Sequence, residues 1–82
     1  MTNKEFAEKM ELRCEDFSVQ VIRLSVLLGN SPEALVVRNQ VTKSGTSLGA
    51  NYREANRSRS PKDFKNKIKI SESEASETVY WL

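Results

Sequence analysis

Apolar residues recur along the first third of the chain at alternating intervals of four and three. In order, the residues of this stripe are Phe6, Met10, Cys14, Phe17, Val21, Leu24 and Leu28. This spacing places them on one face of an α-helix. The pattern predicts a helix over residues 3–28, with Thr2 and Glu5 as a capping box at its start. Cys14 lies in the stripe, so we expect a buried, inert thiol.

A second apolar line runs along the same predicted helix, nearly opposite the first. Leu12, Val19 and Val26 are seven residues apart, and Ile22 lies beside them. A helix that is apolar on two sides needs neighbours on two sides. A chain of this length supplies hardly enough helices, so we take Leu12, Val19 and Val26 as candidate contacts between copies.

The sequence Gly-Asn-Ser-Pro at 29–32 marks a break, and a second helix is predicted over residues 32–56. Its stripe consists of Ala34, Val37, Val41, Ser44, Leu48, Asn51 and Ala55. Two glycines, Gly45 and Gly49, interrupt good helix-forming sequence at a cost of about 1 kcal/mol each. The stretch is either a phosphate-binding loop or a helix with a groove for close packing.

Two observations favour the helix. The stripe continues through residues 43–56 without changing phase. A P-loop also requires Lys-Ser/Thr after its second glycine and a preceding strand, whereas Lys43 and Ser44 come before Gly45 and no strand precedes them. We therefore predict that Gly45 and Gly49 form a helix-packing groove.

A third helix is predicted over residues 61–82, starting at Ser60-Pro61 with Asp63 as the reciprocal cap partner. Its main face consists of Phe64, Ile68, Ser71, Ala75, Thr78, Val79 and Leu82. Ile70 and Trp81 lie about 100° around from that face, which indicates a second contact surface and makes both candidate oligomer contacts. The pattern ends at residue 82 without a cap, so we expect a further helix to follow.

Polar residues within the apolar stripes need partners if they are buried. Ser44 and Asn51 are of this kind, and Glu74 lies at the edge of the third helix near them. Glu74 is either solvated or paired with a basic side chain such as Arg38 or Lys43, or it bonds with Ser44 and Asn51. Such a network would fix the register of the helices.

The composition restricts the chemistry. The 82 residues are 38% hydrophobic, which suits one small domain that is marginal alone. The sequence contains no histidine, the usual general base and commonest metal ligand, so we predict a non-enzymatic protein without metal or cofactor. A single cysteine fits the reducing cytoplasm, and no apolar run approaches the ~20 residues of a membrane span.

Positive charge is concentrated at the second connection. Between residues 51 and 69, seven positive residues stand against Glu54 and Asp63, a net of +5, although the whole chain carries only +2. The candidate nucleic-acid-binding residues are Arg53, Arg57, Arg59, Lys62, Lys65 and Lys69. Such an end attracts phosphate backbones without reading sequence. Alternatively, the arginines complement a helix C-terminus and the lysines only solubilise the third helix.

Three segments resemble one family. They are Arg-Asn-Gln-Val-Thr-Lys-Ser-Gly-Thr-Ser-Leu-Gly-Ala-Asn-Tyr-Arg-Glu-Ala at 38–55, Arg-Ser-Pro-Lys-Asp-Phe at 59–64 and Glu-Ala-Ser-Glu-Thr-Val-Tyr-Trp-Leu at 74–82. Over roughly residues 12–82 the chain resembles bacterial four-helix bundle proteins encoded by intervening sequences in 23S rRNA genes, and related accessory proteins of diversity-generating retroelements. The resemblance implies a fourth helix and, for several members, a homopentameric ring. For the retroelement relatives it implies binding to nucleic acid and reverse transcriptase.

Together these observations predict an all-α, antiparallel up-down helical bundle, with three helices present of an expected four. The leading functional hypothesis is a cytoplasmic, self-associating scaffold whose basic end contacts RNA or DNA. The alternative is a purely structural subunit that docks another protein and has no nucleic-acid role.

Overall fold

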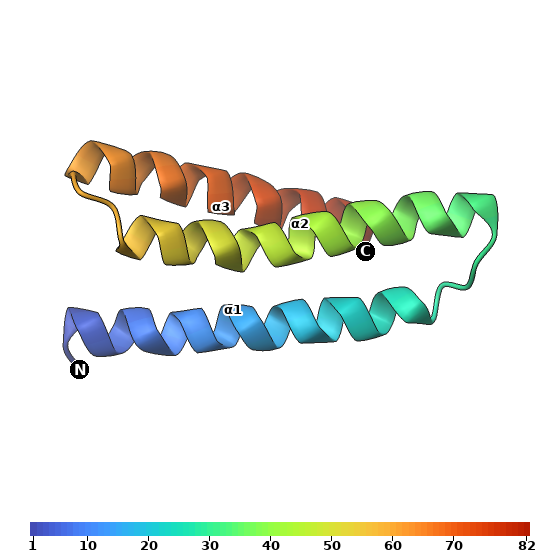
Figure 1. The fold of residues 1–82 in the computed structure, drawn as a ribbon, viewed down its shortest axis with the longest axis horizontal. Coiled ribbons are helices and arrows are strands. Elements are labelled where there is room, and N and C mark those ends of the chain that lie inside the picture. Colours follow the sequence, from blue (N-terminus) through green and yellow to red (C-terminus); the bar gives the residue numbers. More distant parts are fainter.

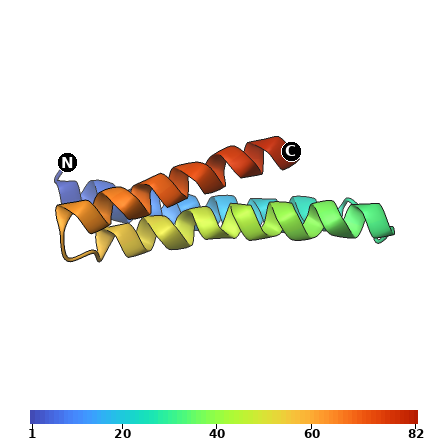
Figure 2. The same ribbon diagram turned by 90° about the horizontal axis from the view of Figure 1, so that it is seen from above.

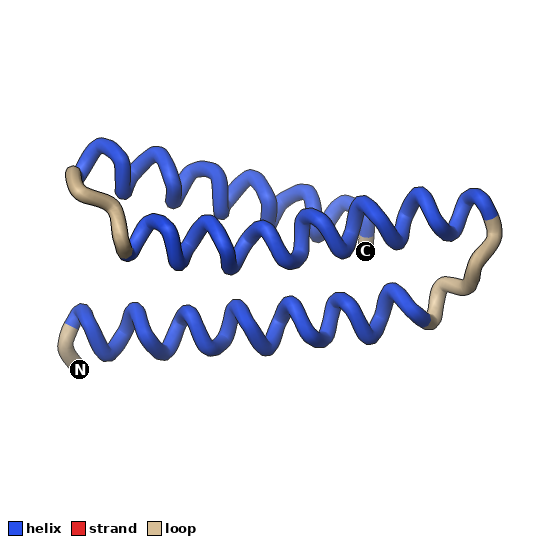
Figure 3. The backbone as a smooth tube through the Cα atoms, viewed as in Figure 1, coloured by secondary structure: helices blue, strands red, loops and turns tan.

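The computed structural model describes residues 1–82 and contains three α-helices and no strand. Helix α1 spans Asn3–Val26, α2 spans Pro32–Asn56 and α3 spans Pro61–Trp81 (Figure 1). Short connections join them in an up-down order (Figure 3). The all-α prediction is confirmed, and α2 is continuous through both glycines of residues 43–56.

Side chains at the three helix starts satisfy backbone N–H groups that have no partner within the helix. At α1, the Glu5 N–H donates to Thr2 Oγ1 at 3.1 Å, and the Thr2 N–H donates to the Glu5 carboxylate. Ser31 and Ser60 accept from the N–H groups of Ala34 and Asp63, both at 3.1 Å. The predicted starts therefore form through the expected cap residues.

The first helix ends two residues earlier than expected. Leu27 and Leu28 form a turn after Val26, and Gly29 adopts a φ of +86°, which favours glycine. Arg38 of α2 donates to the carbonyl oxygen of Gly29 at 2.9 Å and to Oδ1 of Asn30 at 2.6 Å. The turn is thus held by a side chain from the following helix.

Helix α2 is the centre of the molecule. Both α1 and α3 pack against it, whereas no Cα atom of α1 lies within 8 Å of one in α3. Figures 1 and 2 show the two outer helices on different flanks of α2, each running in the opposite direction to α2. The outer helices are therefore parallel to one another and leave part of the bundle interior open.

The buried core is small and rich in hydroxyl groups. Only eight residues are buried, and the apolar side chains among them are Val21, Val41 and Ala55. The others are Gly45, Ser25, Ser44, Ser71 and Thr78. The apolar stripes of the outer helices stay partly uncovered, as the 43% exposure of Leu24 and the 42% exposure of Phe64 show. A fourth helix over these stripes stays a prediction.

Candidate functional site

The contact between α1 and α2 depends on the two helical glycines. A Cβ atom at Gly45 would lie 2.8 Å from Cγ1 of Val21, and one at Gly49 would lie 2.9 Å from Cβ of Cys14. Both separations are too short for real side chains, so α1 occupies the groove that the glycines leave. Ser18 Oγ also lies 3.3 Å from the carbonyl oxygen of Gly45, across the same contact.

The contact between α2 and α3 uses hydroxyl groups instead. Thr78 Oγ1 lies 2.9 Å from Ser44 Oγ, and both residues are only 1% exposed. One end of α3 is fixed in this way, and Ser71 Oγ donates to the carbonyl oxygen of Leu48 at 3.1 Å further along. No buried side-chain polar atom lacks a partner, so the hydroxyl-rich seam is fully bonded.

The hypothesis that Glu74 bonds with Ser44 and Asn51 is wrong. Its side chain is half-buried and makes no hydrogen bond or ion pair, and its carbonyl oxygen accepts from Thr78 at 2.8 Å. Ser44 is paired with Thr78, whereas Asn51 donates to the carbonyl oxygen of Ser47 in its own helix at 2.9 Å. A hydroxyl bridges closely packed helices without the desolvation cost of a carboxylate.

The alternative ion pairs of Glu74 are also absent. Arg38 is bonded to the turn between α1 and α2, and Lys43 is exposed and forms no ion pair. The register of the bundle is therefore held by uncharged groups.

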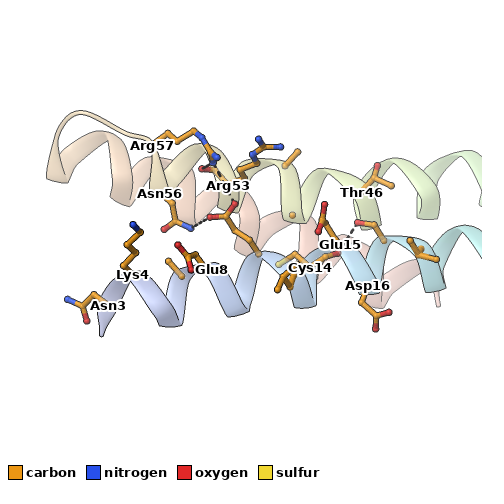
Figure 4. Close-up of a pocket in the computed structure, with 17 residues that line it drawn as sticks. Asn3, Lys4, Glu8, Cys14, Glu15, Asp16, Thr46, Arg53, Asn56 and Arg57 are labelled. Carbon is orange, nitrogen blue, oxygen red and sulfur yellow. Dashed lines mark hydrogen bonds and ion pairs between the residues drawn. The ribbon is translucent and has the colours of Figure 1, made fainter. Parts of the chain in front are cut away.

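At the basic end, Arg57 is already engaged. Its Nη1 lies 3.6 Å from Glu11 Oε1 and donates to the carbonyl oxygen of Arg53 at 3.2 Å. Asn56 donates to the other carboxylate oxygen of Glu11 at 3.1 Å (Figure 4). Arg57 thus complements the C-terminus of α2 and joins it to α1, as the alternative interpretation expected for this residue.

The other candidate nucleic-acid-binding residues are exposed and form no ion pair; they are Arg53, Arg59, Lys62, Lys65 and Lys69. The basic residues of this end point in different directions. Arg53 and Arg57 line a groove between α1 and α2. At 100° per residue, Lys62 and Lys69 lie roughly opposite Ser71, the residue that faces α2, and so point away from the bundle.

Helix α1 brings carboxylates to this same end. Glu8, Glu11, Glu15 and Asp16 line the groove together with Arg53 and Arg57 (Figure 4). Their negative charge offsets part of the field of the arginines. Counting charges along residues 51–69 alone could not reveal this, because the acids lie about 40 residues earlier in the sequence.

Four of the five candidate oligomer contacts lie on exposed surface. Leu12 is 66% exposed and Val26 is 60% exposed, and Val19 and Ile70 are also exposed. Trp81 is half-buried, with its Nε1 3.4 Å from Glu77 Oε1. Exposed apolar lines of this kind mark interaction surfaces when they are contiguous.

The single cysteine and the acidic side chains are the groups considered for catalysis and metal binding. Burial raises the pKa of the Cys14 thiol; Arg13 opposes this rise and Glu11 adds to it. A raised pKa disfavours the nucleophilic thiolate. No group of three or more acidic or cysteine residues is placed to hold a metal ion. None of the helices has the length and apolar character to cross a membrane.

Comparison with known proteins identifies the family. A family model described as 23S rRNA-intervening sequence protein matches residues 3–82. The chain belongs to this family. The resemblance seen in the three sequence segments is therefore confirmed.

A solved structure agrees with this assignment. The chain superposes with a TM-score of 0.83 on a protein of unknown function from the S23 ribosomal protein family of Bacteroides thetaiotaomicron. The two chains are 39% identical, and the match covers 92% of this chain and 67% of the other. No match is found among functionally curated proteins.

Sequence reasoning missed two sets of residues. Ser71 and Thr78 form the hydroxyl seam, and their polar positions in the main face of α3 were a usable signal. Glu11 and Asn56 join α1 to the basic end across 45 residues of sequence. No local pattern indicates this second pair.

Proposed function

We propose that this protein is a non-enzymatic, cytoplasmic scaffold that self-associates and binds RNA or DNA through its basic end. The observation that carries the proposal is the apolar surface that the fold leaves exposed, with Leu12 and Val26 on α1 and Ile70 on α3. This surface occurs in a chain whose helices bury only eight residues.

Self-association is supported by the size of the core. Three buried apolar side chains are few for an 82-residue domain, which must offset a large loss of conformational entropy on folding. Contacts between copies would remove further apolar surface, such as Leu12 and Val26, from water. Light scattering on the intact chain should therefore show a multimer; a monodisperse monomer would contradict this part.

Nucleic-acid binding is supported by exposed cations that form no ion pair within the chain. Arg59, Lys62 and Lys65 are exposed at or near the connection between α2 and α3 and form no ion pair. Cations in this state release counterions from a phosphate backbone, which makes affinity fall steeply with salt.

Titration of labelled RNA and DNA across a salt series tests this part. Arg59→Ala and Lys62→Ala should each weaken binding and reduce the slope of log K against log salt by about one. Arg23→Ala removes the same charge from the far end of α1 and should have little effect. Absent or salt-independent binding would rule out the nucleic-acid role.

A purely structural subunit is the second candidate. It is favoured by the engagement of Arg57 with Glu11 and by the carboxylates that α1 places at the basic end. This candidate predicts no binding of RNA or DNA in the salt series, and it requires no multimer of the chain alone in light scattering. The two measurements therefore separate the hypotheses.

A further inference from the structure

The end of α2 holds an anion that the chain itself supplies. Asn56 Nδ2 donates to Glu11 Oε2 at 3.1 Å, and Arg57 Nη1 lies 3.6 Å from Glu11 Oε1 (Figure 4). Each oxygen of this one carboxylate thus has its own donor. Arginine and amide side chains bind the oxygens of phosphates as well as those of carboxylates. Asn56 and Arg57 therefore present a pair of donors that suits a phosphate group.

The position of this carboxylate shows that side chains hold it, rather than the helix backbone. The C-terminus of a helix carries a partial negative charge and disfavours anions. Asn56 is the last residue of α2, and Arg57 follows it. Arg57 Nη1 also donates to the carbonyl oxygen of Arg53 at 3.2 Å, which offsets part of the negative charge. Asn56 and Arg57 thus hold an anion where the helix dipole opposes one.

The contact between Arg57 and Glu11 is weak. Its 3.6 Å separation is longer than the distance of about 2.7–2.9 Å that is typical of a charge-assisted hydrogen bond. The Arg57 side chain is 53% exposed, and an ion pair with an exposed partner contributes little. Both contacts of the guanidinium use Nη1, so Nε and Nη2 form no bond within the chain. A second anion can therefore bind Arg57 and displace Glu11.

Further cations lie around this site. Arg53 lines the same groove, and Arg59 is exposed just beyond Arg57; neither forms an ion pair. A strand of RNA or DNA held by these cations brings its phosphates to Arg57 at a high effective concentration. A free phosphate ion lacks this advantage and competes with Glu11 alone. The carboxylate therefore favours a ligand with several phosphates over a single phosphate.

We propose that Asn56 and Arg57 form a phosphate-binding site, that the Glu11 carboxylate occupies it in the free chain, and that a phosphate of a bound RNA or DNA strand displaces this carboxylate. The proposal rests on the nucleic-acid binding proposed above and adds a competitor that is part of the fold. Glu11 makes binding weaker and more selective, because a single phosphate ion displaces it less easily than a strand does.

A double-variant cycle tests the competition. Glu11→Gln removes the charge of the carboxylate and should tighten binding of a labelled single-stranded RNA about 2- to 5-fold at low salt, because Arg57 is then free. Glu15→Gln is the control, since Glu15 lines the same groove without forming an ion pair. In an Arg57→Ala background, the advantage of Glu11→Gln over Glu15→Gln should vanish. An advantage that persists without Arg57 would overturn the proposal.

A second measurement does not depend on RNA binding. Inorganic phosphate should shift the NMR signals of the Asn56 side-chain amide and of the Arg57 Nε–H group. The shift should occur at several-fold lower phosphate concentration in Glu11→Gln than in the wild type, whereas chloride at equal ionic strength should leave the signals unchanged. Circular dichroism should show the same helix content in all variants, because Glu11, Glu15 and Arg57 are not buried.

The possible results separate the two proposals. A wild type that binds RNA, with equal effects of Glu11→Gln and Glu15→Gln, overturns the site and leaves the nucleic-acid role intact. Signals that respond to inorganic phosphate in a chain that binds neither RNA nor DNA contradict the nucleic-acid role and assign the site to free phosphate. Signals of Asn56 and Arg57 that neither phosphate nor RNA shifts overturn the site.

Discussion

The two faces by which α2 holds its neighbours use opposite means. Toward α1, the side chains of Gly45 and Gly49 are absent, and the backbones approach until a Cβ atom would collide with Val21 or Cys14. Toward α3, hydroxyl side chains fill the interface and bond across it, as Ser44 does with Thr78. One contact depends on shape, and the other depends on directed bonds.

This difference determines how each contact should respond to change. The interface at the glycines tolerates no added side-chain volume, but it depends little on the polarity of the residues that face the glycines. An interface held by hydroxyl groups accepts a substitution that keeps the side-chain shape, such as threonine to valine. That substitution still removes a hydrogen bond and leaves its partner unsatisfied. The predictions below test this distinction, beginning with the largest expected effect.

Gly49→Leu should be the most destabilising substitution. The new side chain must displace Cys14, whose Cβ and backbone atoms adjoin the site. Overpacking typically costs about 1–3 kcal/mol. At this site the cost of overpacking should exceed the ~1 kcal/mol that leucine gains over glycine in helix propensity. We expect the melting temperature to fall by roughly 10 °C at fixed protein concentration. Ala50→Leu, at an exposed neighbouring position, is the control; an unchanged Gly49→Leu melting temperature would show that nothing packs there.

Thr78→Val should weaken the α3 seam by about 1 kcal/mol, or roughly 5 °C in melting temperature, because shape is kept but the bond to Ser44 is lost. Thr46→Val is the matched control, since the Thr46 hydroxyl bonds only to carbonyl oxygens of its own helix. Thermal unfolding followed by circular dichroism compares the two. Equal effects would indicate that the interhelical bond contributes nothing.

Glu11→Gln should change the free energy of unfolding by less than about 1 kcal/mol, because ion pairs with an exposed partner contribute little. Arg57, the partner, is 53% exposed in its side chain. The same variant should tighten RNA binding at low salt if Arg57 then becomes available to phosphate. Glu15→Gln removes an equal charge one turn further along α1 and serves as control. An equal gain from both variants would assign the effect to net charge alone.

The smallest effect concerns pH. Burial raises the pKa of Cys14 from its ordinary value of 9.0, so the unfolded chain releases the thiol proton at lower pH than the folded chain. The stability due to the neutral thiol is therefore complete below pH 9.0 and is lost as pH rises through the folded-state pKa. Relative to Cys14→Ala, the wild-type melting temperature should decline as pH rises above 9.0. Parallel curves would contradict this linkage.

The sequence predicts the helices well because their start signals are local. Thr2 with Glu5, and Ser31 and Ser60 each followed by proline, act within one turn and need no tertiary contact. The in-phase stripe likewise identified α2 as a helix despite Gly45 and Gly49. Such signals can be read from the sequence because neighbouring residues alone determine them.

The partners of the polar residues were less predictable. Glu74 and Thr78 are one turn apart on nearly the same face, so spacing alone cannot decide which meets Ser44. Asn51 needed no partner from another helix, because a carbonyl oxygen of its own helix suffices. The link from Glu11 to Arg57 depends on how α1 lies along α2, which no local pattern encodes.

The hydroxyl-rich core has a thermal consequence. Exposure of apolar surface makes the heat capacity of unfolding large, and exposure of polar groups lowers it. A separated chain that buries few apolar side chains should therefore unfold with a small heat capacity change and a shallow temperature dependence of stability. If copies associate through their exposed apolar residues, most of the heat capacity change accompanies dissociation of the multimer. Calorimetry at several protein concentrations would then assign this change to the dissociation step.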